Sequence, residues 1–396
     1  MGKQDITLVP DRGLSRLKWE YERERTGWDD LLCFGTADMD YRTPEPVLDA
    51  LRDVLAQGHL GYPQVSDAFY GAIHDYFLRT AGWEIDARTC VAQNVGIYMS
   101  AWNTLDALTR PRDKITILTP VHFCFKRLIN LNDRAVIECP LLYENGSYRI
   151  NYSALEACFA SGSKVLWLCN PHNPIGRAWR REELEQVAAL CIKYQVCIMS
   201  DDVYCGLTFP GAVYTPIASL SKEISYRTVT FYSTSKVYNT TGLRHSFIVA
   251  ENPVLFKKYM ESIEKMDLEY GLNIMGMAAV TAAYNHCDEW LQNLMVQIRK
   301  NYRFIVDFFA ANLPGAVVAE SDAAYFAWVD MRALGLPPQQ LSYLIEQEEH
   351  MIVSGGAVLG KGGAGFIRIN LAASEEHLRE GAERLRRFWQ RHGGGR

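Results

Sequence analysis

Residues 164–204 read KVLWLCNPHNPIGRAWRREELEQVAALCIKYQVCIMSDDVY and contain two short apolar runs with an amphipathic segment between them. The runs 164–171 and 196–201 are rich in consecutive apolar residues, which is typical of strands that are buried on both faces. The segment 182–194 repeats its apolar residues at the spacing of a helix. Strands that alternate with helices are typical of α/β proteins, so this stretch predicts a parallel sheet covered by helices.

The pattern continues on both sides of this stretch. KITILTP (114–120) and VTFYSTS (229–235) predict two more buried strands of the same sheet. The N-terminal part to about residue 45 is irregular and contains prolines, and residues 289–313 predict a long helix followed by short elements. We therefore expect the two chain ends to build a second domain together.

Three of the predicted strand ends carry residues that are suited to chemistry. The segment 170–177 combines two X-Pro steps with a glycine, and Asp201 places a carboxylate at the end of a buried strand. Lys236 lies among hydroxyl residues with Arg244 eight positions later, which suits a phosphate beside a reactive amine. Singly, these are ordinary turn, capping and surface residues. Together, on successive strand ends, they predict one ligand site at the carboxyl edge of the sheet.

The sequence resembles the fold-type-I pyridoxal 5′-phosphate (PLP) enzymes, the aspartate aminotransferase superfamily (class I/II), and within it the cystathionine β-lyase-like C–S lyases. The likeness covers nearly the whole chain. It rests on TADMDYRTPEPVLDAL (36–51), HLGYP (59–63), NPHNPIGRAWRREEL (170–184), SDDVYCGLTFPGAVYTPIASLS (200–221), STSKVYNTTGLR (233–244), DEWLQNL (288–294) and GFIRINLA (365–372). The segments 36–44 and 207–216 point to the lyase branch in particular.

The resemblance implies an architecture as well as a cofactor. It implies a large PLP-binding domain at 46–285, with a mostly parallel seven-stranded sheet covered by helices. A smaller α/β domain would be formed by 1–45 and 286–396. It also implies a homodimer with active sites at the subunit interface.

The resemblance implies a role for each residue that would hold PLP. Lys236 would form a Schiff base with PLP and then act as the base at the substrate Cα. Asp201 would pair with the pyridine nitrogen, and Tyr204 and Asn173 would bond the ring oxygen. The phosphate would be bound by Gly96, Ile97, Ser233, Ser235 and Arg244, and by Tyr62 of the neighbouring subunit.

The substrate would be an amino acid, held on the other side of the cofactor. The resemblance implies that Arg368 and Asn173 bind its carboxylate, with help from the backbone at Ala37. His122 departs from the lyase pattern, which has a tyrosine over the cofactor ring. We predict that His122, rather than Phe123, stacks on the ring and moves protons near neutral pH.

The reaction outcome stays open at this point. The lyase reading is β-elimination of a cystathionine-like cysteine S-conjugate to a thiol, pyruvate and ammonia. Tyr204 and Arg244 are common in aminotransferases, so transamination is an alternative. Decarboxylation coupled to deamination of an S-conjugated cysteine is another, and a non-catalytic PLP-fold regulator is disfavoured because Lys236 and Asp201 are both present.

Composition, charge and cysteine spacing limit which partners, compartments and metal sites are expected. The chain has 396 residues and a net charge of −5 with mixed signs, so neither nucleic acid nor a membrane is an expected partner. The N-terminus has no basic start before an apolar run, and we expect a cytoplasmic protein. The ten cysteines form no C-x-x-C pair, so we expect free thiols and no metal site.

Overall fold

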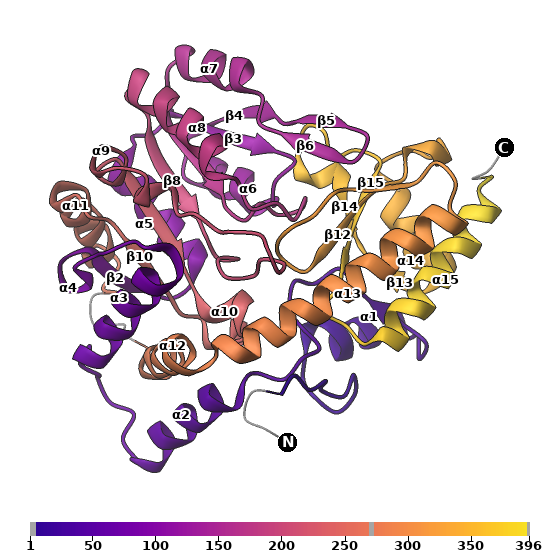
Figure 1. Cartoon of the computed structure of the whole chain (residues 1–396), viewed down its shortest axis with the longest axis horizontal. Coiled ribbons are helices and arrows are strands. Elements are labelled where there is room, and N and C mark those ends of the chain that lie inside the picture. The colour runs from indigo at the N-terminus through magenta and orange to yellow at the C-terminus, as the bar shows by residue number, and fades with distance from the viewer. Residues whose placement is uncertain (1–4, 269–272, 394–396) are drawn as a thin grey trace.

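A seven-stranded sheet forms the centre of the computed structural model, which describes residues 5–268 and 273–393 (Figure 1). In spatial order its strands are β2 (Val91–Asn94), β10 (Ser246–Val249), β9 (Thr228–Tyr232), β8 (Cys197–Asp201), β7 (Ser163–Cys169), β3 (Lys114–Thr119) and β4 (Ala135–Pro140). β10 runs antiparallel to both of its neighbours, and the other adjacent pairs are parallel. The predicted mostly parallel seven-stranded sheet is therefore confirmed.

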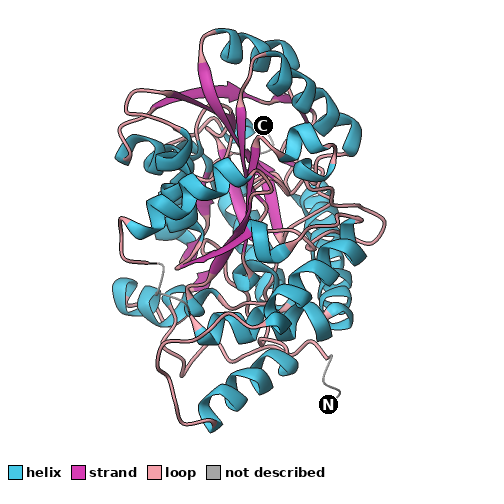
Figure 2. Cartoon of the chain, turned by 90° about the vertical axis from the view of Figure 1, so that its left-hand side faces the viewer, coloured by secondary structure: helices cyan, strands magenta, loops and turns pink. Residues whose placement is uncertain are grey.

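The apolar strands are buried because helices cover both faces of this sheet (Figure 2). Successive side chains of a strand point to opposite faces. In β7, Val165 and Trp167 belong to one apolar cluster, whereas Leu166 and Leu168 belong to another. The first cluster includes residues of α5 (Ile97–Leu108), α6 (Cys124–Leu131) and α11 (Pro253–Glu264), and the second includes residues of α7 (Tyr152–Ala160) and α8 (Arg181–Lys193).

The C-terminal part of the chain builds a smaller antiparallel sheet beside the large one (Figure 1). Its strands, in order, are β11 (Val317–Val318), β12 (Phe326–Asp330), β15 (Phe366–Asn370) and β14 (Ser354–Gly355). The long helix predicted at 289–313 is confirmed as α13 (Asp288–Asn312). α15 (Glu375–Arg391) packs against α13, and α14 (Leu341–Glu349) packs against α15.

The N-terminal segment joins this C-terminal part. β1 (Leu32–Cys33) pairs in parallel with β13 (Met351–Ile352). A π-helical turn at Leu17–Tyr21 and α1 (Glu22–Thr26) precede it. Both chain ends thus meet in one region, although the domain boundaries at 45/46 and 285/286 remain a prediction.

The other elements connect or flank the two sheets. The remaining helices are α2 (Glu45–Ala56), α3 (Asp67–Ala81), α4 (Ala87–Cys90), α9 (Lys222–Ser225), α10 (Thr234–Val237) and α12 (Ile274–His286), and β5 (Leu142–Glu144) pairs with β6 (Ser147–Arg149). Short 3-10 turns lie at Ile217–Ser219, Thr241–Leu243, Arg332–Leu334 and Gly356–Leu359.

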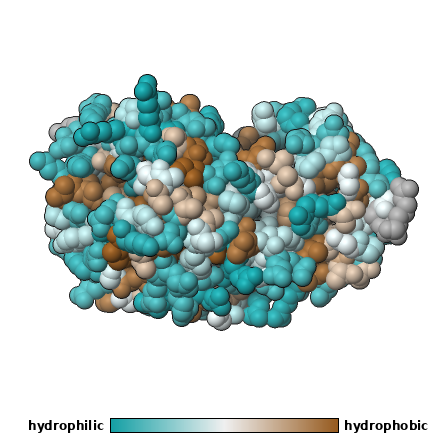
Figure 3. Space-filling model, turned by 90° about the horizontal axis from the view of Figure 1, so that it is seen from above, coloured by the Kyte–Doolittle hydropathy of each residue, from teal (hydrophilic) through white to brown (hydrophobic). Residues whose placement is uncertain are grey.

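Hydrophilic residues cover much of the face in Figure 3, between separate apolar patches. Among the described helices, none has the length and apolar character needed to cross a membrane.

Candidate active site

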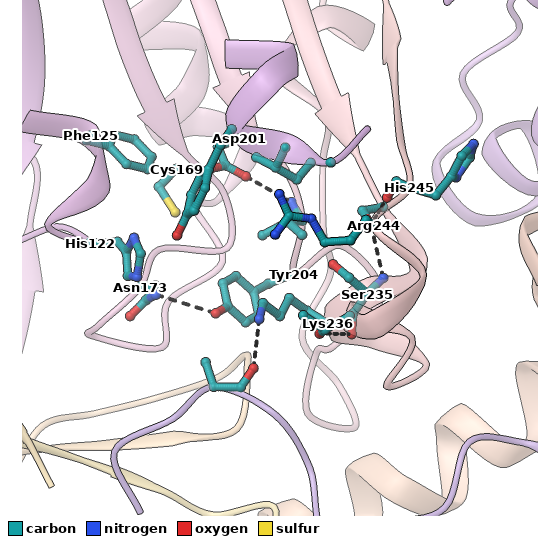
Figure 4. Close-up of a pocket in the computed structure, with 17 residues that line it drawn as sticks. His122, Phe125, Cys169, Asn173, Asp201, Tyr204, Ser235, Lys236, Arg244 and His245 are labelled. Carbon is teal, nitrogen blue, oxygen red and sulfur yellow. Dashed lines mark hydrogen bonds between the residues drawn. The ribbon is translucent and has the colours of Figure 1, made fainter. Parts of the chain in front are cut away.

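One cavity of about 180 Å³ brings most of the predicted site residues together (Figure 4). It lies at the carboxyl ends of β8 and β9 and at the start of α5, where ligands bind in sheets of this kind. The predicted residues that line it are Ala37, Gly96, Ile97, His122, Asn173, Asp201, Tyr204, Ser233, Ser235, Lys236 and Arg244. Tyr62 and Arg368 do not line it.

Lys236 is positioned by the short helix α10, directly after β9. Ser233 caps this helix by accepting a hydrogen bond from the Ser235 backbone N–H at 3.1 Å, and its own hydroxyl donates to the His245 carbonyl at 2.6 Å. The Lys236 Nζ donates to the Ala37 carbonyl at 2.8 Å (Figure 4). Burial lowers the pKa of Lys236 to about 8, because removal from water disfavours the ammonium. The amine is therefore far more available as a base or nucleophile than a surface lysine.

The lowered pKa of Lys236 predicts how PLP uptake depends on pH. Lysine attacks an aldehyde only as the neutral amine. We expect the rate at which apoenzyme takes up PLP to rise about tenfold per pH unit below a pKa of about 8 and to level off above it. Stopped-flow absorbance over a pH series measures this rate. A rate that kept rising up to the ordinary lysine value of 10.5 would contradict the assignment.

Asp201 ends β8 as a buried carboxylate that faces the same cavity. Its one hydrogen bond from a described residue is long, 3.4 Å from the Val203 backbone N–H. Burial raises the pKa of Asp201 to about 7. A buried acid with so few donors suits a protonated ring nitrogen, which would donate a hydrogen bond and favour the ionised form. The buried carboxylate at this end of the cavity therefore fits the pyridine ring of PLP.

The start of α5 and Arg244 form the opposite end of the cavity. Gly96 caps α5 at φ 104°, a conformation that favours glycine, and Ile97 is the first helical residue. A Cβ added at Gly96 would meet only the Arg244 Nε, at 3.8 Å, so the guanidinium lies over the helix start. Arg244 forms no ion pair with any described residue. Free backbone N–H groups, a cation and the Ser235 hydroxyl fit a phosphate, whereas the Ser233 hydroxyl already donates to the His245 carbonyl.

Arg368 lies beside the cavity and contacts it through Asn173. Its Nη1 donates to the Asn173 Oδ1 at 2.8 Å, and its Nη2 donates to the Gly35 carbonyl at 2.8 Å and to the Ser354 hydroxyl at 3.0 Å. The guanidinium also lies 4.2 Å from the Phe326 ring centre. Arg368 is 4% exposed, and its Nε is buried without a hydrogen-bond partner in the described part of the chain. An unpaired donor beside Asn173 fits a carboxylate that the protein does not itself supply.

We expect Arg368→Lys to raise KM for an amino-acid substrate roughly ten- to a hundredfold, because lysine keeps the charge but loses the planar fork. Steady-state kinetics measures this change, and a larger effect on KM than on kcat is expected. Arg332→Lys is the matched control, because that guanidinium forms a separate, half-exposed ion pair with Asp330. Equal effects of both variants would argue against carboxylate binding by Arg368.

His122 lines the cavity, whereas Phe123 is 44% exposed and does not. This placement fits the expectation that His122 is the residue that faces the ring. Burial, with nearby Arg368 and Lys236, lowers the pKa of His122 to about 3. The imidazole is therefore neutral at pH 7, which argues against the predicted proton transfer by His122 near neutral pH. Its stacking on the ring remains a prediction.

One contact at the cavity joins two predicted residues, and another is made by a residue that the sequence analysis did not predict. The Asn173 Nδ2 donates to the Tyr204 hydroxyl at 3.4 Å, which places both predicted partners of the ring oxygen together. Tyr325, which was not predicted, donates to the same Ala37 carbonyl as Lys236, at 3.2 Å. Tyr325 adjoins β12, and its contact with a residue far away in sequence leaves no local pattern that could have revealed it.

Further lining residues were not foreseen either: Tyr98, Phe125, Cys169, Val203, Thr241 and His245. Tyr98 follows the predicted Ile97 directly, so its position at the helix start was the available signal. Tyr62 is 90% exposed, and its predicted contact with the phosphate of another subunit remains a prediction. In residues 5–268 and 273–393, no group of three or more metal-ligating side chains is arranged to hold a metal ion.

Comparisons with known proteins agree with this geometry. The family model for aminotransferase class I and II matches residues 29–385. Cystathionine β-lyase PatB of Bacillus subtilis is 32% identical over 94% of this chain and 96% of its own length. The structure of cystalysin from Treponema denticola, which contains PLP, superimposes with a TM-score of 0.92 at 28% identity, covering 97% of this chain and 98% of that one.

A PLP-bound C–S lyase from Staphylococcus hominis is also similar, with a TM-score of 0.88 at 25% identity and 96% coverage of both chains. The match to the family model spans most of the sequence, and the solved relatives hold PLP in the same fold. This chain therefore belongs to the aminotransferase class I and II family and is a PLP-dependent enzyme.

Proposed function

We propose that this enzyme is a C–S lyase that β-eliminates a cysteine S-conjugate to a thiol, pyruvate and ammonia. The observation that carries the proposal is the single cavity that holds Lys236, Asp201 and Asn173 beside Arg368. Support for the lyase outcome comes from relatives named as cystathionine β-lyase and C–S lyase that align over nearly the whole chain. When bound, PLP withdraws electrons from the Cα of the amino acid.

Arg368 and Asn173 orient the substrate in this proposal. The Arg368 Nε and the Asn173 side chain bind the α-carboxylate, and the bonds from Arg368 to Gly35 and Ser354 fix the guanidinium before substrate arrives. The pKa of the Lys236 amine is about 8. This amine then takes the proton from Cα. Its acceptor at Ala37 holds the amine on the side of the cavity toward the small sheet.

Asp201 and Tyr204 set the electronic environment of the ring. The Asp201 carboxylate would accept a hydrogen bond from the ring nitrogen, and its burial would make this interaction strong because little water competes. The Tyr204 hydroxyl, which accepts from the Asn173 Nδ2, would donate to the ring oxygen. Loss of the Cα proton is followed by cleavage of the Cβ–S bond, in which the sulfur leaves with the electron pair. The three-carbon remainder is then hydrolysed to pyruvate and ammonia.

The same residues also support transamination, since the family includes aminotransferases. The two outcomes differ in their requirement for a keto acid. We expect purified enzyme with PLP and L-cystathionine to release thiol and pyruvate in equal amounts without any added keto acid. Product that appears only after a keto acid is added would instead establish transamination.

We also propose that the enzyme is a homodimer. Tyr62 supports this proposal because it is 90% exposed within one chain. In a dimer, a second copy would bring that hydroxyl to the phosphate of its neighbour.

A further inference from the structure

One backbone carbonyl, that of Ala37, accepts hydrogen bonds from two side chains in different parts of the fold. The Lys236 Nζ donates to it at 2.8 Å from α10, beside the large sheet (Figure 4). The Tyr325 hydroxyl donates to it at 3.2 Å from the residue directly before β12 of the small sheet. A carbonyl oxygen has two lone pairs, so these two donors use both. A change at Tyr325 therefore acts on the amine of Lys236 through this oxygen.

The small sheet fixes the backbone on either side of this carbonyl. Asn370 is buried on β15, and its Nδ2 donates to the Thr36 carbonyl at 2.8 Å and to the Asp38 carbonyl at 2.7 Å. These two bonds hold the residues before and after Ala37. The Ala37 carbonyl is therefore kept in place without the Tyr325 hydroxyl, which is an additional contact.

Tyr325 presents its hydroxyl to the Ala37 carbonyl as a fixed donor. The residue is fully buried, and in the described part of the chain its hydroxyl makes no other hydrogen bond. Its ring packs edge to face against the Tyr204 ring, with 5.9 Å between the ring centres. Burial raises the pKa of Tyr325 well above its ordinary value, so the hydroxyl keeps its proton. Its O–H dipole thus stays directed at the oxygen that also receives the Lys236 amine.

This fixed dipole opposes a positive charge on Lys236. Both donors direct a partially positive hydrogen at the same oxygen, and these two hydrogens repel each other. The repulsion grows when the amine becomes an ammonium. The neutral amine is the form that can take a proton, and the Tyr325 hydroxyl therefore favours the form that acts as a base.

Other charged groups act on Lys236 as well. The titratable and charged groups that do so from other elements are Asp38, Cys124, His122, Asp201 and Arg368. The acids among them favour the ammonium, and the guanidinium opposes it. Among the described residues, none of these groups hydrogen-bonds to the Tyr325 hydroxyl. A substitution confined to that hydroxyl therefore leaves all of them in place.

We propose that Tyr325 is a positioning residue for proton transfer, which acts through the Ala37 carbonyl to keep the Lys236 amine at a fixed acceptor and in its neutral form. The proposal rests on the proposed role of Lys236 as the lysine that binds PLP and as the base at Cα. It does not depend on the reaction outcome, because elimination and transamination both begin with loss of the Cα proton.

Tyr325→Phe removes the hydroxyl and keeps the ring. We would measure the rate of PLP uptake by the apoenzyme over a pH series, because this rate follows the neutral fraction of Lys236 and needs no substrate. The pH midpoint is expected to rise by about half a unit to one unit, which slows uptake at pH 7 roughly three- to tenfold. Well above both midpoints the two rates should be equal. The ionisations of PLP itself are common to both proteins and cancel in the comparison.

Tyr148→Phe is the matched control. Tyr148 is also buried beside the small sheet, where its hydroxyl accepts from the Trp328 Nε1 at 2.9 Å. This variant is expected to lower the melting temperature and to leave the pH midpoint unchanged, because its hydroxyl does not contact the Ala37 carbonyl. In Tyr325→Phe, an unchanged midpoint, or a loss of rate that is the same at every pH, would overturn the proposal.

A second variant keeps the test sharp if Tyr325→Phe does not fold. Replacement of Tyr325 by 3-fluorotyrosine retains the hydroxyl and makes it a stronger donor, because fluorine withdraws electrons from the ring. The pH midpoint is then expected to fall rather than rise. A midpoint that stays the same or rises in this variant would overturn the proposal.

A wrong assignment of Lys236 has a different signature. In that case Lys236→Ala apoenzyme takes up PLP as fast as the unaltered apoenzyme, and the role of Tyr325 is overturned together with that of Lys236. Uptake that requires Lys236, with a midpoint that does not respond to either change at position 325, overturns the role of Tyr325 alone.

Discussion

Lys236→Ala is expected to lower kcat/KM for thiol release by roughly a thousandfold or more, because it removes both the attachment point of PLP and the base at Cα. The absorption band of lysine-bound PLP should disappear at the same time. The fold should survive, since the Lys236 Nζ makes a single described hydrogen bond, to the Ala37 carbonyl. Assays of thiol release, absorption spectra and thermal unfolding together measure these effects.

Lys257→Ala is the matched control for this substitution. The Lys257 side chain is 79% exposed on α11 and lies 3.9 Å from Glu261 in a surface ion pair. Such pairs contribute little to stability, so this variant should keep its activity, spectrum and melting temperature. Substantial activity in Lys236→Ala would show that another group supplies the base.

Asp201→Asn is expected to lower kcat roughly a hundredfold and to weaken PLP binding, because the neutral amide no longer stabilises a protonated ring nitrogen. The amide has nearly the same shape and can still accept from the Val203 backbone N–H, so folding should be retained. Steady-state kinetics and titration of apoenzyme with PLP measure the two effects.

Asp202→Asn provides a sharp comparison, because this neighbour does not line the cavity. Its side chain accepts from the Ser200 hydroxyl at 2.5 Å and from the Tyr214 hydroxyl, and burial raises the pKa of Asp202 to about 8. At neutral pH the acid is therefore mostly uncharged, and an amide replaces it without loss of charge. We expect PLP affinity to change little in this variant. An equal loss in both variants would contradict the role of Asp201.

The central fold could be predicted because its signals are local. The apolar runs at 114–120, 164–171, 196–201 and 229–235 correspond to β3, β7, β8 and β9, and the helix at 182–194 corresponds to α8. Parallel strands bring their carboxyl ends to one edge, so Asn173, Asp201 and Lys236 were expected to meet. The antiparallel run of β10 was not foreseen, because a short buried strand carries no mark of its direction.

The rest of the site depends on contacts between distant segments. Ser354 orients Arg368 across a small antiparallel sheet, and Tyr325 contacts a backbone carbonyl that is far away in sequence. No periodicity links such positions in the sequence. The low pKa of His122 follows from its burial and from two nearby cations, neither of which a motif reveals. The sequence thus predicted residues on both sides of the cofactor, including Arg368 and Asn173, whereas the contacts that orient them required the structure.

Borohydride reduction of the holoenzyme tests the central claim most directly, because it makes the bond between PLP and its lysine permanent. Digestion and mass spectrometry then locate the modified residue. We predict a phosphopyridoxyl group on the peptide that contains Lys236. A label on any other lysine, or a holoenzyme that cannot be labelled, would contradict the assignment of this cavity as the PLP site.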